Sequence, residues 1–345
     1  MPGDGGYSSS SGSGGGGARL RCPSPLLCTA AGWAAVTEAW ALLQYRGMRQ
    51  RDEQRRADLF HAGGSSNAPQ PAATVAAPGA VSIIVPALNE AAGIEPLLTY
   101  LQQSLQPEAA EIIVVDGGSS DATVAIAQRC GVRVVQAGRG RARQMNVGAA
   151  AAAGDILVFV HADARPPQQL VSLVRAALWQ PGVVLGGFRP LIEYEGRPLR
   201  FFSANNTLKS YYLPLLLRPL SFLRGLRILF GDQTLFCRAA DFRKAADIPS
   251  VQMRVGGYDS RLPIMEDADL CLRLHMAGPA SQPGRRGRIV QINSPPNCTS
   301  GRRLVSWGQV HATVVHAIIG VSWYLGASPQ QLVALYRRLY TDVYR

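Results

Sequence analysis

The chain has 345 residues, enough to bury one large core or two moderate ones. Its formal charge is +12 at pH 7, but the basic side chains are almost all Arg, with Lys only at Lys209 and Lys244, and no aromatic-interleaved basic motif of a recognised kind occurs. We therefore expect no nucleic-acid partner. The six cysteines show neither CxxC pairs nor a disulfide-framework spacing, which predicts reduced thiols and no zinc site.

Residues 1–79 differ in composition from the rest of the chain. Ser8 to Gly17 is a Gly/Ser run, Ala62 to Gly79 has the composition of a linker, and Ala30 to Leu59 has the spacing of a weak amphipathic helix. Two interpretations stay open. The segment is a flexible extension, or it is a plastid or mitochondrial transit peptide, because Met1 to Ala30 is rich in Ser and poor in acids. Without targeting the protein would be cytoplasmic, and a secretory signal is not expected.

From Val81 onward, apolar strands alternate with helices. We expect strands at 81–86, 111–115, 132–135 and 155–160, and helices at 91–105, 122–129 and 143–153, with Asp121 as the N-cap of the second helix. This alternation predicts a parallel sheet with crossover helices, which binds its ligand at the carboxyl ends of the strands.

Acidic side chains follow three of these strands. Glu90 follows the first strand, Asp116 ends the second, and Asp163 follows the fourth. Because they should converge at one sheet edge, their charges would repel each other unless a cation lies between them. The pattern therefore indicates a divalent cation that carries a diphosphate.

The second half of the chain adds polar groups at further element ends. Gly186 to Arg189 indicates a strand, Gly231-Asp232-Gln233 precedes an apolar run, and Glu266 and Asp267 open a helix over 268–276. A last helix is expected over 329–340. Tyr211 to Phe230 and His311 to Ala327 are apolar but interrupted, so neither predicts a spanning helix. Buried or acceptor-side helices are favoured for both over contact with a membrane surface.

A series of motifs in this order resembles the signatures of family 2 glycosyltransferases. They are Pro86–Glu90, Val114–Thr123, His161–Asp163, Gly231–Gln233, Met265–Asp267 and Thr299–Arg303. The set is similar to small, non-processive bacterial-type members, of the kind associated with selenodomain or radical-SAM proteins. Any one motif would be weak, but the order is specific.

The resemblance extends from Val81 to the C-terminus and implies the GT-A fold. This is an α/β fold with a mixed, mostly parallel sheet flanked by helices, followed by C-terminal helices. It divides the chain into the extension over 1–79, a nucleotide-sugar-binding half over 80–180, an acceptor-side half over 181–290 and a helical segment over 291–345.

The resemblance also implies a donor site for a nucleotide-diphospho-sugar, with a UDP-sugar favoured. The implied contacts are Pro86, Ala87, Asn89, Glu90, Asp116, Arg143, Asn146, Asp163, Asp232, Gln233 and Arg303. Asp116 would accept from the uracil imide, and capping of the next turn is the alternative role. Asp163 would bind Mg²⁺ or Mn²⁺. Because His161 replaces the first acid of the family's DxD triplet, a single carboxylate is left, and the ion would rest largely on substrate phosphates and water.

For catalysis, the resemblance implies that Asp267 deprotonates an acceptor hydroxyl, that Glu266 supports it, and that the anomeric centre is inverted. The acceptor is not indicated, and a lipid-linked one would need a membrane-facing surface. Two other functions stay open: a nucleotide-sugar-binding protein without turnover, and a sugar-phosphate nucleotidyltransferase. The latter lacks support, because no Gly-rich, Lys-bearing phosphate loop follows the first strand.

Overall fold

The computed structural model of the chain describes residues 30–40, 79–105, 110–244, 257–262 and 264–339, without the side chains of Lys244, Arg303 and Gln309. Residues 30–40 form a helix. The predictions for the rest of the N-terminal extension, the transit peptide included, lie outside the described residues. Cys130, Cys237, Cys271 and Cys298 are free thiols, as the cysteine spacing predicts for them.

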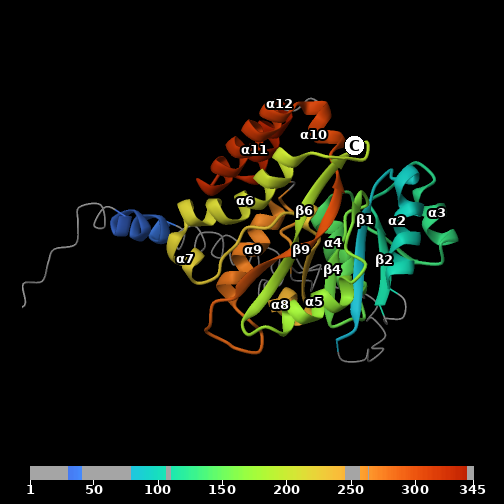
Figure 1. The fold of residues 1–345 in the computed structure, drawn as a ribbon, viewed down its shortest axis with the longest axis horizontal. Helices are drawn as coiled ribbons and strands as arrows, with labels where there is room; N and C mark the ends of the chain where they lie inside the picture. The colour runs from blue at the N-terminus through green and yellow to red at the C-terminus, as the bar shows by residue number, and fades with distance from the viewer. Residues whose placement is uncertain (1–29, 41–78, 106–109, 245–256, 263, 340–345) are drawn as a thin grey trace, which may run out of the picture.

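The strands of the described region form one nine-stranded sheet (Figure 1). They are β1 (Val81–Ala87), β2 (Ala110–Asp116), β3 (Arg133–Gln136), β4 (Ile156–Phe159), β5 (Ala164–Arg165), β6 (Val183–Tyr194), β7 (Arg197–Pro198), β8 (Leu235–Arg238) and β9 (Arg288–Ser300). Their order is β3-β2-β1-β4-β8-β6-β9-β5, with β7 beside β6. Strands β3, β2, β1 and β4 run parallel, and β8 is antiparallel to both of its neighbours. The predicted mixed α/β sheet is confirmed.

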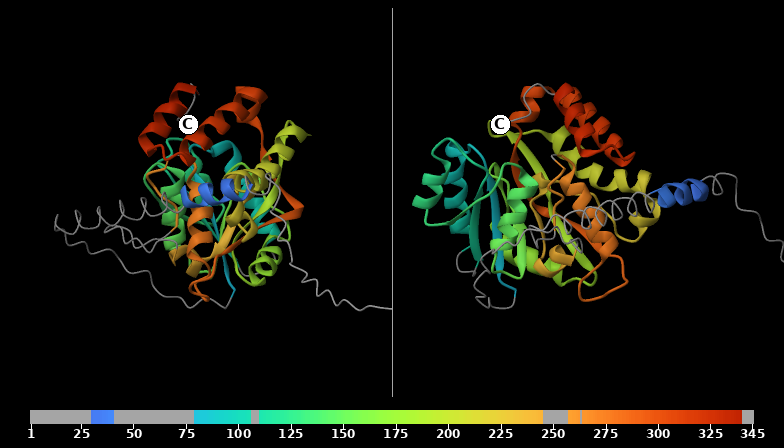
Figure 2. Two further views of the ribbon diagram at one scale, coloured as in Figure 1. Left: turned by 90° about the vertical axis from the view of Figure 1, so that its left-hand side faces the viewer. Right: turned by 180° about the vertical axis from the view of Figure 1, so that it is seen from behind.

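Helices cover both faces of this sheet and extend beyond one of its edges (Figures 1 and 2). They are α2 (Ala91–Ser104), α3 (Thr123–Arg129), α4 (Arg141–Ala151), α5 (Leu170–Trp179), α6 (Arg200–Leu217), α7 (Pro219–Leu223), α8 (Ala239–Lys244), α9 (Glu266–Ala277), α10 (Arg302–Trp307), α11 (Gln309–Tyr324) and α12 (Pro329–Leu339), with a short 3-10 helix, η1 (Gly231–Gln233). The core on one face includes α2, α3 and α5, and the core on the other includes α4, α8 and α9. The sheet is thus the middle of three layers.

The parallel part of the sheet follows directly from its sequence. Every residue of β1 is buried, as expected for a strand that is covered on both faces. Helix α4 packs so close to the sheet that a Cβ at Gly148 would lie 2.4 Å from Ile84 Cγ2. A side chain at this crossing would displace Ile84 or Val115. The start of α4 lies near the carboxyl ends of the strands because α4 directly follows β3.

Two expected helix starts differ from the structure. Helix α4 begins at Arg141, directly after Gly140 with φ 126°, and not near Arg143. The N-cap of α3 is Ala122 and not Asp121. The Asp121 carboxylate instead accepts hydrogen bonds from the backbone N–H groups of Thr123 and Ala91, at 3.0 and 3.1 Å, so it ties the starts of α2 and α3 together.

A second group of helices lies beyond the sheet edge. Helices α10, α11 and α12 stack above α6 and α7 in Figure 1, and α11 packs on α12 through a small cluster that includes Val315, Ile319 and Leu332. None of the described helices has both the length and the apolar character needed to cross a bilayer.

Candidate active site

The carboxyl ends of β1 and β2 lie side by side and carry the first predicted site residues. Ala87 is paired with Asp116, and Gly117 donates to the Ala87 carbonyl at 2.9 Å. The Asp116 carboxylate is 2 % exposed and accepts from the N–H groups of Gly118 and Ser119 at 3.0 and 3.1 Å. Its turn-capping role is therefore observed, and its contact with a base stays a proposal.

The two loops that follow these strands are joined by side chains. Asn89, at φ 54°, accepts from Ser120 N–H at 2.8 Å, and its own N–H donates to the Ser119 hydroxyl at 2.9 Å. Glu90 is the N-cap residue of α2. A Cβ at Gly93 would lie 3.9 Å from Glu90 Oε2 and 3.8 Å from the Ala162 carbonyl, so Glu90 lies close to the turn that carries Asp163.

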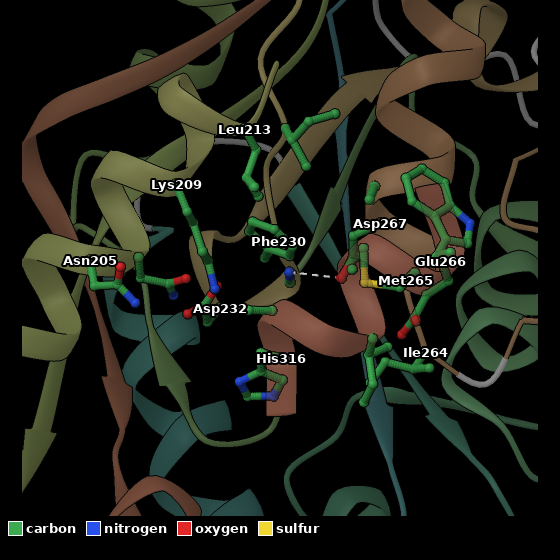
Figure 3. Close-up of a pocket in the computed structure, with 18 of the residues that line it drawn as sticks. Asn205, Lys209, Leu213, Phe230, Asp232, Ile264, Met265, Glu266, Asp267 and His316 are labelled. Carbon is green, nitrogen blue, oxygen red and sulfur yellow. Dashed lines mark hydrogen bonds between the residues drawn. The ribbon is translucent and has the colours of Figure 1, made fainter. Parts of the chain in front are cut away.

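A cavity of about 430 Å³ lies beside this edge, between the β4 turn, η1, the start of α9 and helices α6 and α11. Four acidic side chains line it: Asp163, Asp232, Glu266 and Asp267. Figure 3 shows Asp267 and Asp232 on two sides of this space. Residues that are up to 104 positions apart in the sequence thus share one cavity.

Asp267 is the most perturbed acid of the cavity. Its Oδ2 accepts from the N–H of Gly231 at 2.8 Å, shown in Figure 3, while its buried Oδ1 has no hydrogen-bond partner among the described residues. Burial, and then the nearby charge of Glu266, raises the pKa of Asp267 to about 8, against the lowering effect of Arg141. A carboxyl group with such a pKa can take up and release a proton near neutral pH.

Glu266, the first residue of α9, is 2 % exposed and forms an ion pair with Arg141 at 2.9 Å. Arg141 is the first residue of α4 and is 45 % exposed. The charge of Glu266 raises the pKa of Arg141 further. Arg141 lines the cavity and is not among the predicted contacts.

Gly231 allows two functional side chains to approach each other. A Cβ at this position would lie 2.3 Å from the ring of His161 and 3.2 Å from Asp267 Oδ2. His161 and Asp267 therefore both lie against Gly231, around the position that a Cβ would take. No side chain larger than hydrogen fits there without displacing one of them.

Figure 3 shows the end of the Lys209 side chain beside Asp232, on one side of the cavity. Burial raises the pKa of Asp232, Lys209 opposes this rise, and the charge of Asp163 adds to it. Burial lowers the pKa of Lys209. Asp232 Oδ1 is buried and has no hydrogen-bond partner in the described part of the chain. Asp163 and Asp232 thus form an electrostatically coupled pair of acids with one oxygen unused.

Within the described residues, no three His, Cys, Asp or Glu side chains are grouped to hold a metal ion on their own. The unused oxygen of Asp232 and the carboxylate of Asp163 fit an ion that takes most of its ligands from phosphates and water, as Mg²⁺ commonly does. Asp163 and Asp232 therefore fit the predicted Mg²⁺ or Mn²⁺ only when phosphates and water supply its other ligands.

Other predicted contacts are used inside the protein. The Asn146 side chain donates to the Tyr258 carbonyl at 2.8 Å and accepts from the Tyr258 N–H at 3.0 Å. Gln233 is fully buried, donates to the Ser210 hydroxyl at 3.0 Å and accepts from Gln291 at 2.8 Å. Neither residue lines the cavity, and neither do Pro86, Ala87, Asn89, Glu90 and Asp116, which lie along and after the ends of β1 and β2. We leave Asn146 and Gln233 out of the site proposed below because their side chains are bonded within the protein.

Two predicted arginines are not brought to the cavity. Arg143 is exposed on α4 and packs beside Gly138. Arg303 lies in α10, but its side chain is outside the described part of the structure. Arg141 occupies the position beside the acids that was expected for Arg143.

Comparison with known proteins gives a family match over part of the chain. Residues 82–242 match the family described as Glycosyl transferase family 2. The pre-mycofactocin glycosyltransferase of Mycobacterium tuberculosis is 26% identical over 205 residues, which cover 57% of this chain and 39% of that protein. The glucosyl-3-phosphoglycerate synthase of the same organism is 35% identical over 133 residues, covering 35% of this chain and 39% of that protein.

Among solved structures, glucosyl-3-phosphoglycerate synthase from M. tuberculosis in complex with Mn²⁺, UDP and glucosyl-3-phosphoglycerate has a TM-score of 0.46 and 22% identity, covering 75% of this chain and 79% of that one. The chain spans about two fifths of the length of the curated relatives that it matches. The matched region contains β1 to β4 and η1, and therefore Asp116, Asp163 and Asp232.

Proposed function

We propose that this protein is an inverting glycosyltransferase that moves a sugar from a nucleotide-diphospho-sugar, with a UDP-sugar favoured, to an acceptor hydroxyl. The observation that carries the proposal is Asp267, a buried acid with a raised pKa in the same cavity as Asp163 and Asp232. The family match over residues 82–242 supports the reaction class. The assignment to a small bacterial-type subgroup stays a prediction.

In the proposed reaction, the acceptor hydroxyl loses its proton to Asp267 while its oxygen bonds to the anomeric carbon of the donor. The bond from that carbon to the diphosphate oxygen breaks, and the nucleoside diphosphate leaves with the electron pair. Attack from the face opposite the leaving group inverts the centre. Gly231 N–H fixes one carboxylate oxygen of Asp267, so the other is left to receive the proton.

The donor would lie along the β1–β2 edge, with its diphosphate toward Asp163. Pro86, Ala87, Asn89, Glu90 and Asp116 form this edge. A divalent ion bound there would supply positive charge for the leaving diphosphate, and Asp163 with Asp232 would hold it. Arg141 adds a fixed positive charge at the cavity.

A panel of UDP-, GDP- and dTDP-sugars tests the proposal. Thermal shift with and without Mn²⁺ reports donor binding, and mass spectrometry with NMR of the products reports turnover and anomeric configuration. We expect a UDP-sugar to give the largest shift, and Asp163→Asn to reduce the metal-dependent part. Binding without products would favour the non-catalytic alternative, and release of pyrophosphate would favour nucleotidyl transfer.

A further inference from the structure

The helices around the cavity mouth carry no acidic residue. Residues 200–223, which form α6 and α7, and residues 302–339, which contain α10 to α12, include no Asp or Glu. They include seven basic residues: Arg200, Lys209, Arg218, Arg302, Arg303, Arg337 and Arg338. A surface built from such helices attracts anions and is not repelled by an anionic lipid layer.

The outward sides of these helices are apolar. On α11, Val310, Val314, Ile318 and Val321 recur at helical spacing and are 77%, 49%, 41% and 49% exposed, and Leu325 continues the stripe. On α6 and α7 the exposed apolar residues are Phe201, Leu208, Tyr212, Leu215, Leu216, Leu220 and Leu223. Stripes of this length on neighbouring helices exceed the scattered apolar exposure of an ordinary surface.

The helix over residues 30–40 extends the same face. Trp33 Nε1 donates to the Leu216 carbonyl at 3.0 Å. The helix carries one acid, Glu38, and its carboxylate accepts a hydrogen bond from the Ser221 hydroxyl. Trp33 and Trp40 are exposed. The left-hand view of Figure 2 shows this helix beside α6, with α11 above it on the same side of the molecule. Tryptophan is favoured at the boundary between lipid and water.

The cavity borders on this face, because Tyr212 and Val321 line the cavity and are also exposed on α6 and α11. Its lining combines the acids Asp267, Asp232 and Asp163 with Leu213, Leu217 and Trp323. Its charged lining comprises four acids against three cations, Arg141, Lys209 and Arg218, so it offers no surplus positive charge for a small anionic acceptor. An amphiphile, with a hydroxyl for the acids and an alkyl chain for the apolar walls, matches this lining.

We propose that the face formed by α6, α7, α11 and residues 30–40 docks on an anionic lipid surface, and that the cavity takes the hydroxyl-bearing end of an amphiphilic acceptor held in that surface. This inference rests on the proposed glycosyl transfer and names its acceptor class. Arg200 on α6 and the exposed arginines of the adjoining helices α10 and α12, Arg302, Arg337 and Arg338, supply the positive charge at the headgroups, whereas Lys209 and Arg218 line the cavity. The apolar stripes enter the interface, and no helix needs to cross the bilayer.

Vesicle co-sedimentation tests the docking face. The full chain is mixed with vesicles of phosphatidylcholine alone or with phosphatidylglycerol, at low and high salt. We expect binding to the anionic vesicles that weakens with salt, and a loss of about tenfold in partitioning for the Leu223→Ser/Val310→Ser double variant. The matched control is Trp179→Ser, since Trp179 on α5 is 90% exposed but lies outside this face.

Calorimetry with n-alkyl glucosides, kept below their micelle concentrations, tests the cavity. We expect affinity to rise about threefold per added methylene until the cavity is full. Leu213→Asn should flatten this dependence and leave vesicle binding intact. Leu216→Asn, three residues later on the exposed side of α6, should weaken vesicle binding and leave the dependence of glucoside affinity on chain length unchanged. Thermal denaturation verifies that each variant is folded.

Nucleotide binding separates the two proposals. UDP affinity is measured on the same samples, and it should not change in any of these variants. UDP binding without binding of vesicles or glucosides overturns this inference and leaves the proposed function standing. Equal losses for Trp179→Ser, or a dimer in light scattering that the Leu223→Ser/Val310→Ser variant dissociates, would also overturn it. Amphiphile and vesicle binding without any nucleotide binding would instead contradict the glycosyltransferase proposal.

Discussion

Arg141 and Glu266 form an ion pair of 2.9 Å that joins the first residue of α4 to the first residue of α9. The two helices come from opposite sides of the predicted boundary near residue 180, so this contact links the donor-side and acceptor-side parts of the chain. It also controls the charge next to Asp267, because Glu266 raises the pKa of Asp267 and Arg141 lowers it.

Replacing Asp267 by Asn should abolish most transfer while leaving the donor bound. Loss of a general base costs about 100- to 10,000-fold in rate. In the unaltered protein, turnover should rise with pH through about 8, as Asp267 loses its proton. Initial rates between pH 5 and 10 and thermal shift with a UDP-sugar check both points. A variant that keeps the wild-type rate would show that Asp267 is not the base.

The same substitution has a predictable effect on stability. The pKa of Asp267 is raised in the folded state, so the protonated carboxyl is favoured there, and stability is lost as pH rises from about 4 to about 8. Asn carries no charge and avoids this loss. The melting temperature of Asp267→Asn relative to wild type should therefore increase with pH across this range, as calorimetry at several pH values would reveal. A constant difference would argue against a raised pKa.

Replacing Arg141 by Met should leave the buried Glu266 carboxylate without its ion-pair partner. Because Arg141 is half-exposed, we expect a loss of about 1–2 kcal/mol in unfolding free energy, below the value for a fully buried pair. Removing the cation should also move the rise in activity to higher pH, since Arg141 lowers the pKa of Asp267. Denaturant unfolding and pH–rate profiles measure the two effects. Arg143→Met, on the same helix but exposed, is the matched control, and equal effects in both variants would contradict the assignment.

Replacing Gly231 by Ala should disturb His161 and Asp267 together. The added Cβ would lie 2.3 Å from the His161 ring, so we expect a destabilisation of about 1–3 kcal/mol and a large fall in kcat. Gly320→Ala is the control, because Gly320 also lines the cavity but a Cβ there meets only Met265 at 4.0 Å. A second change, His161→Ala, should recover the stability of Gly231→Ala. No recovery would mean that the clash lies elsewhere.

Replacing Asn146 by Ala should affect stability and not donor binding. The substitution leaves the buried backbone groups of Tyr258 without partners, at a cost of about 1–3 kcal/mol. KM for the donor should stay unchanged. A rise in KM at full stability would restore Asn146 as a nucleotide contact.

The sequence predicts best the strands in which nearly every residue is buried. Strands β1 and β2 are short, β-branched and closed by turns, so their ends and the positions of Asp116 and Glu90 follow from local pattern alone. The position of Asp163 follows from the shared carboxyl edge of parallel strands, whereas Asp267 opens a helix and its place in the same cavity follows from the order of the motifs alone.

The predicted contacts that the structure places away from the cavity depend on distant contacts or on which face of a helix is turned toward the sheet. Nothing near Asn146 indicates that Tyr258, 112 residues later, would take both ends of its amide. The choice between Arg141 and Arg143 depends on which face of α4 is turned toward the sheet. Arg141 lies four residues before Met145 and seven before Gly148, which pack on the sheet, whereas Arg143 is turned about 200° away. That spacing was a readable signal.

Gly231 lies against both His161 and Asp267, because a Cβ at this position would meet both side chains. A displacement of the β4 turn by an arriving diphosphate would thus reach the carboxylate through a single hydrogen bond and one van der Waals contact. Occupancy on one side and protonation on the other become thermodynamically linked, and the linkage must act equally in both directions. We therefore expect donor binding to release a proton into the surrounding solution.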